Sequence, residues 1–422
     1  MTDAYDEAKR LGEVLRRARV LARRTQGDVA TALGYHQSKV SRLEGGKGTE
    51  DSQVLRAVAR ELGIPLASVG LADVPATRNS EPETDDMHRR NFLAASLATL
   101  AVPAAAPSRA GSGALVQALL PGPIPPAQDE DQDLLKLGER ISEVRRLFYA
   151  CDYTRLEGTL PSLITDLRNA AAGSDVAVGL LATAYQTSAS LLLKRGDQGN
   201  AWLAVGRAMA EAERSGDPVV LASSVRVHTH LLARGRHTSQ AITLVRHTAD
   251  QLTGAYDQRS PRYLAALGLL LLRGVTAASS GGDRAATHDF LTEAKEIARY
   301  VALDRPDAWA NFSPTNVSLH EVSATVAFGD VGLALEAARP LMRRHIPAPE
   351  RRAALWVETA RAYSQQGRLA DGYQALRIAE SCAAQDIRRP AIRELVADMA
   401  ARDRRRTLPE LHHFSRQLGV PA

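Results

Sequence analysis

Apolar residues recur at helical spacing along most of the chain. From about Gln132 to Gly419 one apolar helix follows another, and no segment shows the strict alternation that marks a half-buried strand. Aromatic residues make up only 5% of the 422 residues, while Ala and Leu are abundant. Because this balance favours helix over strand, we predict an all-α fold with two or three domains.

Residues 25–47 near the N-terminus have the pattern of two helices joined by a tight turn. The Thr25 hydroxyl can cap the first helix, and Gly34 permits the turn that follows it. A second helix is expected from about Gln37 to Glu44. The apolar positions that face inward from both helices are Val29, Ala30, Leu33, Val40 and Leu43. The outward face of the second helix is polar and suited to base edges and phosphates.

Further helices are expected on both sides of this segment. Leu11–Arg19 reads as a basic amphipathic helix, Ser52–Leu62 as a helix, and Pro65–Val69 as a single turn. Taken together, residues 9–72 resemble the Cro/phage-repressor (XRE) class of DNA-binding domain, which implies a five-helix, lambda-repressor-like bundle over residues 1–74.

The resemblance implies a role for several polar side chains. Gln26 would touch a phosphate, and Lys39, Ser41 and Lys47 would lie at or near contacts to the DNA backbone. Bases would be read by Gln37, Ser38 and Arg42. The family usually has Ser or Thr where His36 stands, which predicts a weaker or pH-sensitive helix cap at that position.

Positive charge is concentrated in the same segment. From Lys9 to Lys47 there are ten Lys or Arg residues and three acidic ones, whereas the whole chain carries a net charge of +5. The rest of the chain is therefore slightly acidic. A basic surface confined to one small domain is typical of phosphate binding.

Residues 75–130 read as a linker that contains a misleading motif. Segment 87–106 looks like a twin-arginine export signal, with Arg89 and Arg90 before an apolar run. The run is about 15 residues long, too short to span a bilayer, and it follows a DNA-binding segment. We expect a short amphipathic helix that packs on a neighbour or a second subunit. The alternatives are an exported product that starts at Met87 and a remnant of an old gene fusion.

Residues 131–422 show a repeated pair of helices. Short turns centred on Asp152, Asp197, Arg236, Asp283, Asp330 and Arg368 follow one another at 45, 39, 47, 47 and 38 residues. The pairs resemble tetratricopeptide repeats, which implies a curved α-solenoid with a concave binding face. With the N-terminal domain, this resembles regulators of an actinobacterial type whose repeats dimerise and sense a peptide or small molecule.

Polar residues that interrupt apolar helices are candidates for contacts with such a signal. They are Tyr185, Arg226, His230, Asn311, Asn316 and His320. Arg226 and His230 lie four residues apart, as do Asn316 and His320, so each pair shares a helix face. A satisfied packing or surface group is the alternative at each position.

No pattern of catalytic residues is present, and we expect neither an enzyme nor a cofactor. The nucleophile elbow, the P-loop, the zinc-protease motif and the dinucleotide fingerprint are missing from the sequence. The histidines between 228 and 247 lack metal-site spacing, and Cys151 and Cys382 lie too far apart to suggest a disulfide.

We therefore expect a sequence-specific transcription regulator in the cytoplasm, associated with the nucleoid rather than a membrane. A homodimer would place two recognition helices on an inverted repeat of double-stranded DNA. The alternative is a protein-interaction scaffold in which DNA binding is secondary; deletion of residues 1–74 separates the two, because only a regulator would lose its main phenotype.

Replacing Arg42 with Ala should cost roughly 1–3 kcal/mol of binding free energy at the cognate site and relax the base preference there. Lys47→Ala is the comparison: it should weaken binding to all duplexes similarly and flatten the salt dependence, because it removes a phosphate contact. Mobility-shift titrations at several salt concentrations measure both effects. An Arg42→Ala variant that binds its operator as tightly as the parent would show that the recognition helix is misassigned.

Overall fold

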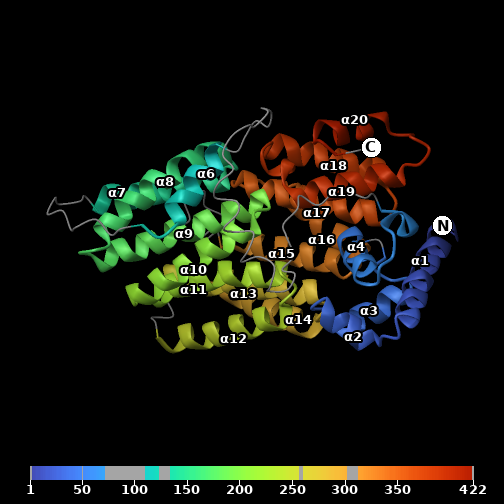
Figure 1. The fold of residues 1–422 in the computed structure, drawn as a ribbon, viewed down its shortest axis with the longest axis horizontal. Helices are drawn as coiled ribbons and strands as arrows, with labels where there is room; N and C mark the ends of the chain where they lie inside the picture. The colour runs from blue at the N-terminus through green and yellow to red at the C-terminus, as the bar shows by residue number, and fades with distance from the viewer. Residues whose placement is uncertain are drawn as a thin grey trace, which may run out of the picture.

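The computed structural model describes residues 2–49, 51–71, 110–122, 134–255, 260–301 and 312–420. Over these ranges the protein is all-α and contains no strand, as the sequence predicts. The chain forms a small N-terminal bundle and a large array of paired helices (Figure 1).

The N-terminal bundle has the predicted elements. They are α1 (Thr2–Leu21), α2 (Gln26–Ala32), α3 (Gln37–Glu44), α4 (Ser52–Glu61) and the 3₁₀ turn η1 (Leu66–Val69). Thr25 and Asp28 form a capping box at the start of α2. His36 caps α3 through its Nδ1 atom, which accepts the Ser38 N–H at 3.4 Å. Gly34 has a φ of 61°, a conformation that glycine adopts without steric cost.

The array consists of six helix pairs and a C-terminal cap. The predicted turns all join the two helices of a pair. The pairs are α7 (Leu134–Tyr149) with α8 (Tyr153–Ala170), α9 (Asp175–Arg195) with α10 (Gln198–Ser215), α11 (Pro218–Arg234) with α12 (Thr238–Ala255), α13 (Pro261–Gly281) with α14 (Arg284–Ala298), α15 (Pro314–Ala327) with α16 (Val331–Met342), and α17 (Pro349–Gln365) with α18 (Leu369–Cys382). The cap follows as η3 (Asp386–Arg388), α19 (Pro390–Arg402) and α20 (Pro409–Gln417).

The first helices of the pairs form an inner layer. Helices α7, α9, α11, α13, α15 and α17 each contact the next in this series. The small residues that follow the turns sit where helices approach closely; Ala201, Ala204 and Ala208, for example, are fully buried. Two inner helices, α9 and α13, are long and apolar enough to cross a membrane, but most of each apolar window is buried inside the array, so core packing accounts for their composition.

The array closes on itself. Helix α7 contacts α17, and the Lys194 ammonium on α9 lies 2.8 Å from Glu350 Oε1 and 2.9 Å from Asp386 Oδ1. The Tyr153 hydroxyl donates to the same Asp386 oxygen at 2.8 Å. Burial raises the pKa of Asp386, but Lys194 and Arg389 more than offset this, so the pKa lies below its usual value. The first and last pairs are thereby joined, and we call the closed array the ring.

Part of the predicted linker belongs to the ring instead. Helix α6 (Ala110–Leu119) lies inside residues 75–130 but packs on α8, and Leu115 and Leu119 are fully buried in the ring core. The predicted linker 75–130 therefore contains a helix that packs on the ring, because two leucines four residues apart give this short helix an apolar face. The twin-arginine-like segment 87–106 lies outside the described residues.

Asp386→Ala should destabilise the protein by about 3–5 kcal/mol, because it leaves buried cationic partners without their carboxylate. Urea unfolding of the full chain measures the change. Glu296→Ala is the control: its exposed pair with Arg299 should contribute at most about 1 kcal/mol. Equal effects of the two substitutions would show that ring closure does not depend on this buried network.

Candidate nucleic-acid interface and central cavity

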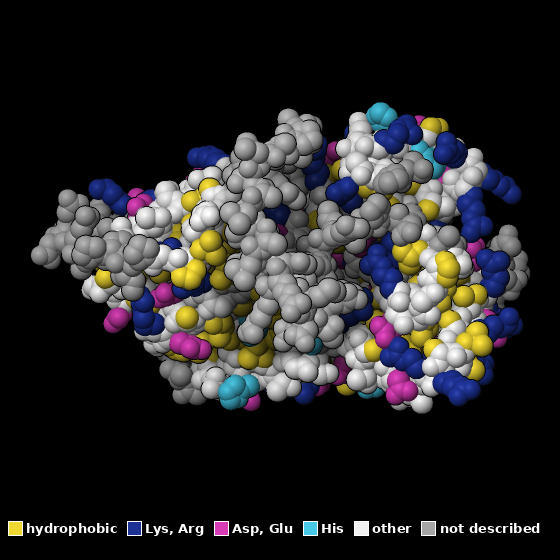
Figure 2. Space-filling view, in the orientation of Figure 1, with side chains coloured by type: hydrophobic (Ala, Val, Ile, Leu, Met, Phe, Trp, Pro, Cys, Tyr) yellow, Lys and Arg dark blue, Asp and Glu magenta, His cyan; other side chains and the backbone are white. Residues whose placement is uncertain are grey.

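Helix α3 presents the predicted polar face, but part of it is turned toward the ring. Gln37, Ser38, Ser41 and Lys47 are exposed. Lys39, in contrast, is 8% exposed, and Arg42 is partly covered. The exposed cations of the N-terminal bundle lie along its outer edge (Figure 2). The structure therefore divides the predicted DNA-contacting residues into an open set and a covered set.

The covered residues bind backbone carbonyls at the ends of ring helices. The Lys39 ammonium donates to Ser280 O at 2.6 Å, and Arg42 donates to Phe328 O. Arg42 also lies 3.9 Å from the Asp330 carboxylate. These carbonyls belong to the C-terminal turns of α13 and α15, where unpaired C=O groups and the helix dipole are negative. The ring thus offers α3 the kind of acceptor that a DNA phosphate would offer.

The start of α3 is held in the same way. The backbone N–H of His36 donates to Gly281 O, and the Thr238 hydroxyl donates to Gly34 O. Gly282 allows the end of α13 and the start of α3 to approach this closely. Its φ is 82°, and a Cβ at this position would lie 2.7 Å from Lys39 Cβ. The positive N-terminal end of α3 therefore points at the negative C-terminal end of α13.

A second contact joins α4 to the C-terminal cap. Arg56 and Asp398 form an ion pair in which both side chains are almost completely buried, and α4 packs on α19. The bundle is therefore attached to the ring through both α3 and α4 (Figure 1). We call this arrangement the docked state.

Gln26 does not point freely outward in the docked state. Its amide donates to Glu44 at 2.8 Å, and Glu44 is also paired with Arg19. Burial raises the pKa of Glu44, but the bonds from Arg19 and Gln26 more than offset this and lower it overall. Glu44 thus joins α1, α2 and α3, and one N–H of the Gln26 amide is used within the bundle.

Between the ring and the docked bundle lies a cavity of about 640 Å³, which we call the central cavity. The inner helices of the ring form most of its wall, and the bundle closes part of it with Tyr35, Lys39, Asp51, Arg56 and Arg60. Twelve Lys or Arg residues line the cavity, against four acidic residues. Among the lining residues alone the cations therefore exceed the carboxylates by eight, while Asp386 and Asp398 behind the lining pair with Lys194, Arg389 and Arg56.

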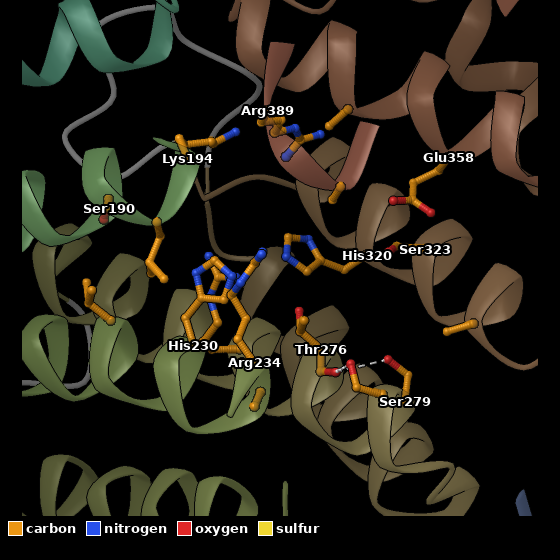
Figure 3. Close-up of a pocket in the computed structure, with 18 of the residues that line it drawn as sticks. Ser190, Lys194, His230, Arg234, Thr276, Ser279, His320, Ser323, Glu358 and Arg389 are labelled. Carbon is orange, nitrogen blue, oxygen red and sulfur yellow. Dashed lines mark hydrogen bonds between the residues drawn. The ribbon is translucent and has the colours of Figure 1, made fainter. Parts of the chain in front are cut away.

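Three of the predicted ligand-contacting residues meet in this cavity. Arg226, His230 and His320 all line it. Figure 3 shows His320 reaching into the space that His230 and Arg234 line from the other side, with Lys194 and Arg389 above them. All three lie on first helices of their pairs, and these helices form the inner layer of the ring, which accounts for the convergence.

The other candidates fall elsewhere. Tyr185 is buried in the ring core, where its hydroxyl accepts a hydrogen bond from Arg168 Nε at 2.8 Å; its neighbour Gln186 faces the cavity instead. Asn316 is 2% exposed and lies in the first turn of α15, away from the cavity lining. Neither side chain lines the cavity, because Tyr185 is one helix position away from Gln186 and Asn316 lies one turn before His320 on α15. Asn311 lies outside the described residues.

The positive charge of the cavity changes the titration of its side chains. Burial, reinforced by Arg226 and Arg351, lowers the pKa of Arg273 to about 9. Burial, with Arg351 and Arg273, lowers the pKa of His320 to about 3. His230 is lowered well below its usual value by burial and by four surrounding cations. Both imidazoles are therefore neutral near pH 7.

Several cavity residues were missed from the sequence. Arg273 interrupts the run of leucines in α13, and Lys194 ends the apolar stretch of α9. The criterion that selected Arg226, a charged residue inside an apolar helix, would have found both. Arg351 and Arg389 carry no such signal, because their neighbours are also polar and their position is set by ring closure.

Comparison with known protein families supports the assignment of the bundle. Residues 10–69 match the family model described as a helix-turn-helix domain. No curated protein matches the chain. The N-terminal part is thus a helix-turn-helix domain, followed by a ring of helix pairs. Among the described residues, no group of three or more His, Cys, Asp or Glu side chains could hold a metal ion.

Acidification below about pH 6.5 should destabilise the fold, because the unfolded chain takes up protons that His230 and His320 cannot accept in the cavity. The contribution of each histidine to the free energy of unfolding is complete above its pKa in the unfolded chain. As the pH falls from that value toward the lower pKa of the folded protein, the contribution decreases by up to about 1.4 kcal/mol per pH unit. Urea unfolding of His320→Gln between pH 7.5 and 5 should show a correspondingly weaker pH dependence. Parallel profiles for the variant and the parent would contradict this assignment.

Proposed function

We propose that this protein is a sequence-specific transcription regulator whose ring senses a ligand and controls access of α3 to DNA. The helix-turn-helix domain supplies the DNA-binding surface. The repeat ring resembles tetratricopeptide sensor domains in its paired helices and its inward-facing polar residues. We place the protein in the cytoplasm, acting as a homodimer on an inverted repeat, because recognition helices of this class act in pairs one DNA turn apart.

One observation carries the regulatory part of the proposal. The Lys39 and Arg42 side chains and the start of α3 donate to carbonyls of the ring. A duplex would need the same donors for its phosphates and bases. Docking and DNA binding therefore compete for one set of groups, and any ligand that binds the two states differently shifts the balance between them.

The Arg56–Asp398 pair offers a way to weaken docking without altering α3. Asp398 lies on α19, outside the helix-turn-helix domain. Breaking a buried ion pair costs about 3–5 kcal/mol, and once the bundle leaves the ring, Arg56 regains water. The cost therefore falls on the docked state.

Asp398→Ala should bind its selected duplex at least tenfold more tightly than the parent chain. Duplexes are first selected from random or genomic fragments with the full-length protein, and affinities are then measured by mobility shift. Glu410→Ala is the matched control, because it removes the same charge from an exposed position on α20 and should leave the affinity unchanged. Arg42→Ala is also measured in the Asp398→Ala variant. Because docking is already weakened there, the loss of duplex affinity reports the base contact of Arg42 and not its contact with the ring.

Two results would contradict the proposal in different ways. If neither the parent nor Asp398→Ala prefers any duplex over random competitor, the protein is not a sequence-specific DNA-binding regulator. If both bind a selected duplex with equal affinity, DNA binding stands but docking does not limit it.

A further inference from the structure

The central cavity holds more positive charge than its own carboxylates can balance. Glu350 is already shared between Lys194, at 2.8 Å, and Arg351, at 3.4 Å. Glu358 pairs with Arg361 at 3.4 Å. The remaining acidic residues lie at the side of the bundle and the cap. The carboxylates are thus committed, and the cavity retains its excess of cations.

Arg226 and Arg273 stand out among these cations. They project from neighbouring inner helices, α11 and α13, into the same cavity. Arg226 lowers the pKa of Arg273, and both arginines lower the pKa of His230. Neither forms a hydrogen bond or ion pair with another residue in the described ranges. Two adjacent guanidinium groups without an acceptor cost folding free energy, since recessed charges need a partner.

The groups around them are suited to binding oxygen atoms. Guanidinium groups bind phosphate and carboxylate through paired N–H donors. The neutral imidazole of His230 has an N–H to donate as well, whereas His320 donates its Nδ1 proton to Asn316 O at 2.9 Å. The hydroxyl group of Ser323 also lines the cavity. The wall therefore supplies many donors, and its volume of about 640 Å³ lies in the range of small-molecule sites.

We propose that the central cavity binds a small multivalent oxyanion, a molecule with several phosphate or carboxylate groups held between Arg226 and Arg273. This deepens the proposed function by giving the chemical class of the ligand. Lys39, Arg56 and Arg60 of the bundle line the same cavity. An anion that contacts both sides favours the docked state and, by linkage, weakens DNA binding.

Pyrophosphate and citrate serve as probes, because they carry phosphate and carboxylate charge respectively at similar size. Isothermal titration of the full-length chain should show one site for at least one of them, and the preferred probe identifies the anionic group. Arg226→Gln and Arg273→Gln should each weaken its binding at least tenfold. Arg339→Gln removes the same charge from an exposed position on α16 and should change the affinity less than twofold.

Thermal melting separates a binding role from a structural one. Without a probe, Arg226→Gln and Arg273→Gln should melt at the same temperature as the parent or higher, because each removes a like charge from the cavity. With the preferred probe, the parent should gain stability over a chloride control of equal ionic strength, and the two variants should gain little.

The proposal is overturned if neither probe binds the parent at millimolar concentration, or if both arginine variants bind as tightly as Arg339→Gln. It is also overturned if both variants unfold more easily than the parent without a probe, since the arginines would then be structural. None of these measurements uses DNA. A protein that binds a selected duplex but no anion would fail here while the proposed function stands.

Discussion

Closure of the ring by a buried network of charges is the constraint on which the remaining features depend. Lys194 lies between Glu350 and Asp386, and thereby ties the second helix pair to the last pair and to η3. An open solenoid of helix pairs exposes its inner face to solvent. Once the ends are joined, the inner helices face one another and enclose a volume. The polar residues on their inner faces then become the lining of a cavity.

Closure also gives the arginines of the inner helices an environment that they would not have in an open array. Their mutual proximity and burial lower the pKa of Arg273 and hold His320 and His230 neutral. Arginine keeps its charge under such conditions better than lysine or histidine. Binding sites commonly contain groups whose placement lowers the stability of the fold. The neighbouring cations of the central cavity are such groups.

The docked helix-turn-helix domain shows how helix ends can take the place of phosphates. Carbonyl groups at the C-termini of α13 and α15 accept from Lys39 and Arg42, and α3 meets α13 end to end with opposed dipole charges. These contacts need no acidic side chains on the ring apart from Asp330. A sequence search for an acidic surface that mimics DNA would therefore not find this interface. Donors of Lys39 and Arg42 that bind ring carbonyls are unavailable to a duplex, and docking therefore opposes DNA binding.

Short-range patterns in the sequence were sufficient to predict the elements and their local chemistry. Spacing, caps and turn glycines were sufficient to locate α2, α3 and the six turns between paired helices, because these features depend on residues a few positions apart. The same reasoning placed Arg226, His230 and His320 on inner faces. It did not separate Tyr185 from its neighbour Gln186, it did not show that Asn316 lies one turn before the cavity, and it did not predict α6, which lies in a segment rich in glycine and proline. Three features followed from tertiary contacts alone: the closure of the array, the cavity to which seven helices contribute cations, and the covering of α3. These features depend on contacts between residues far apart in the chain, such as Arg56 and Asp398, which are separated by 342 positions. A pattern of neighbouring residues cannot predict such a contact.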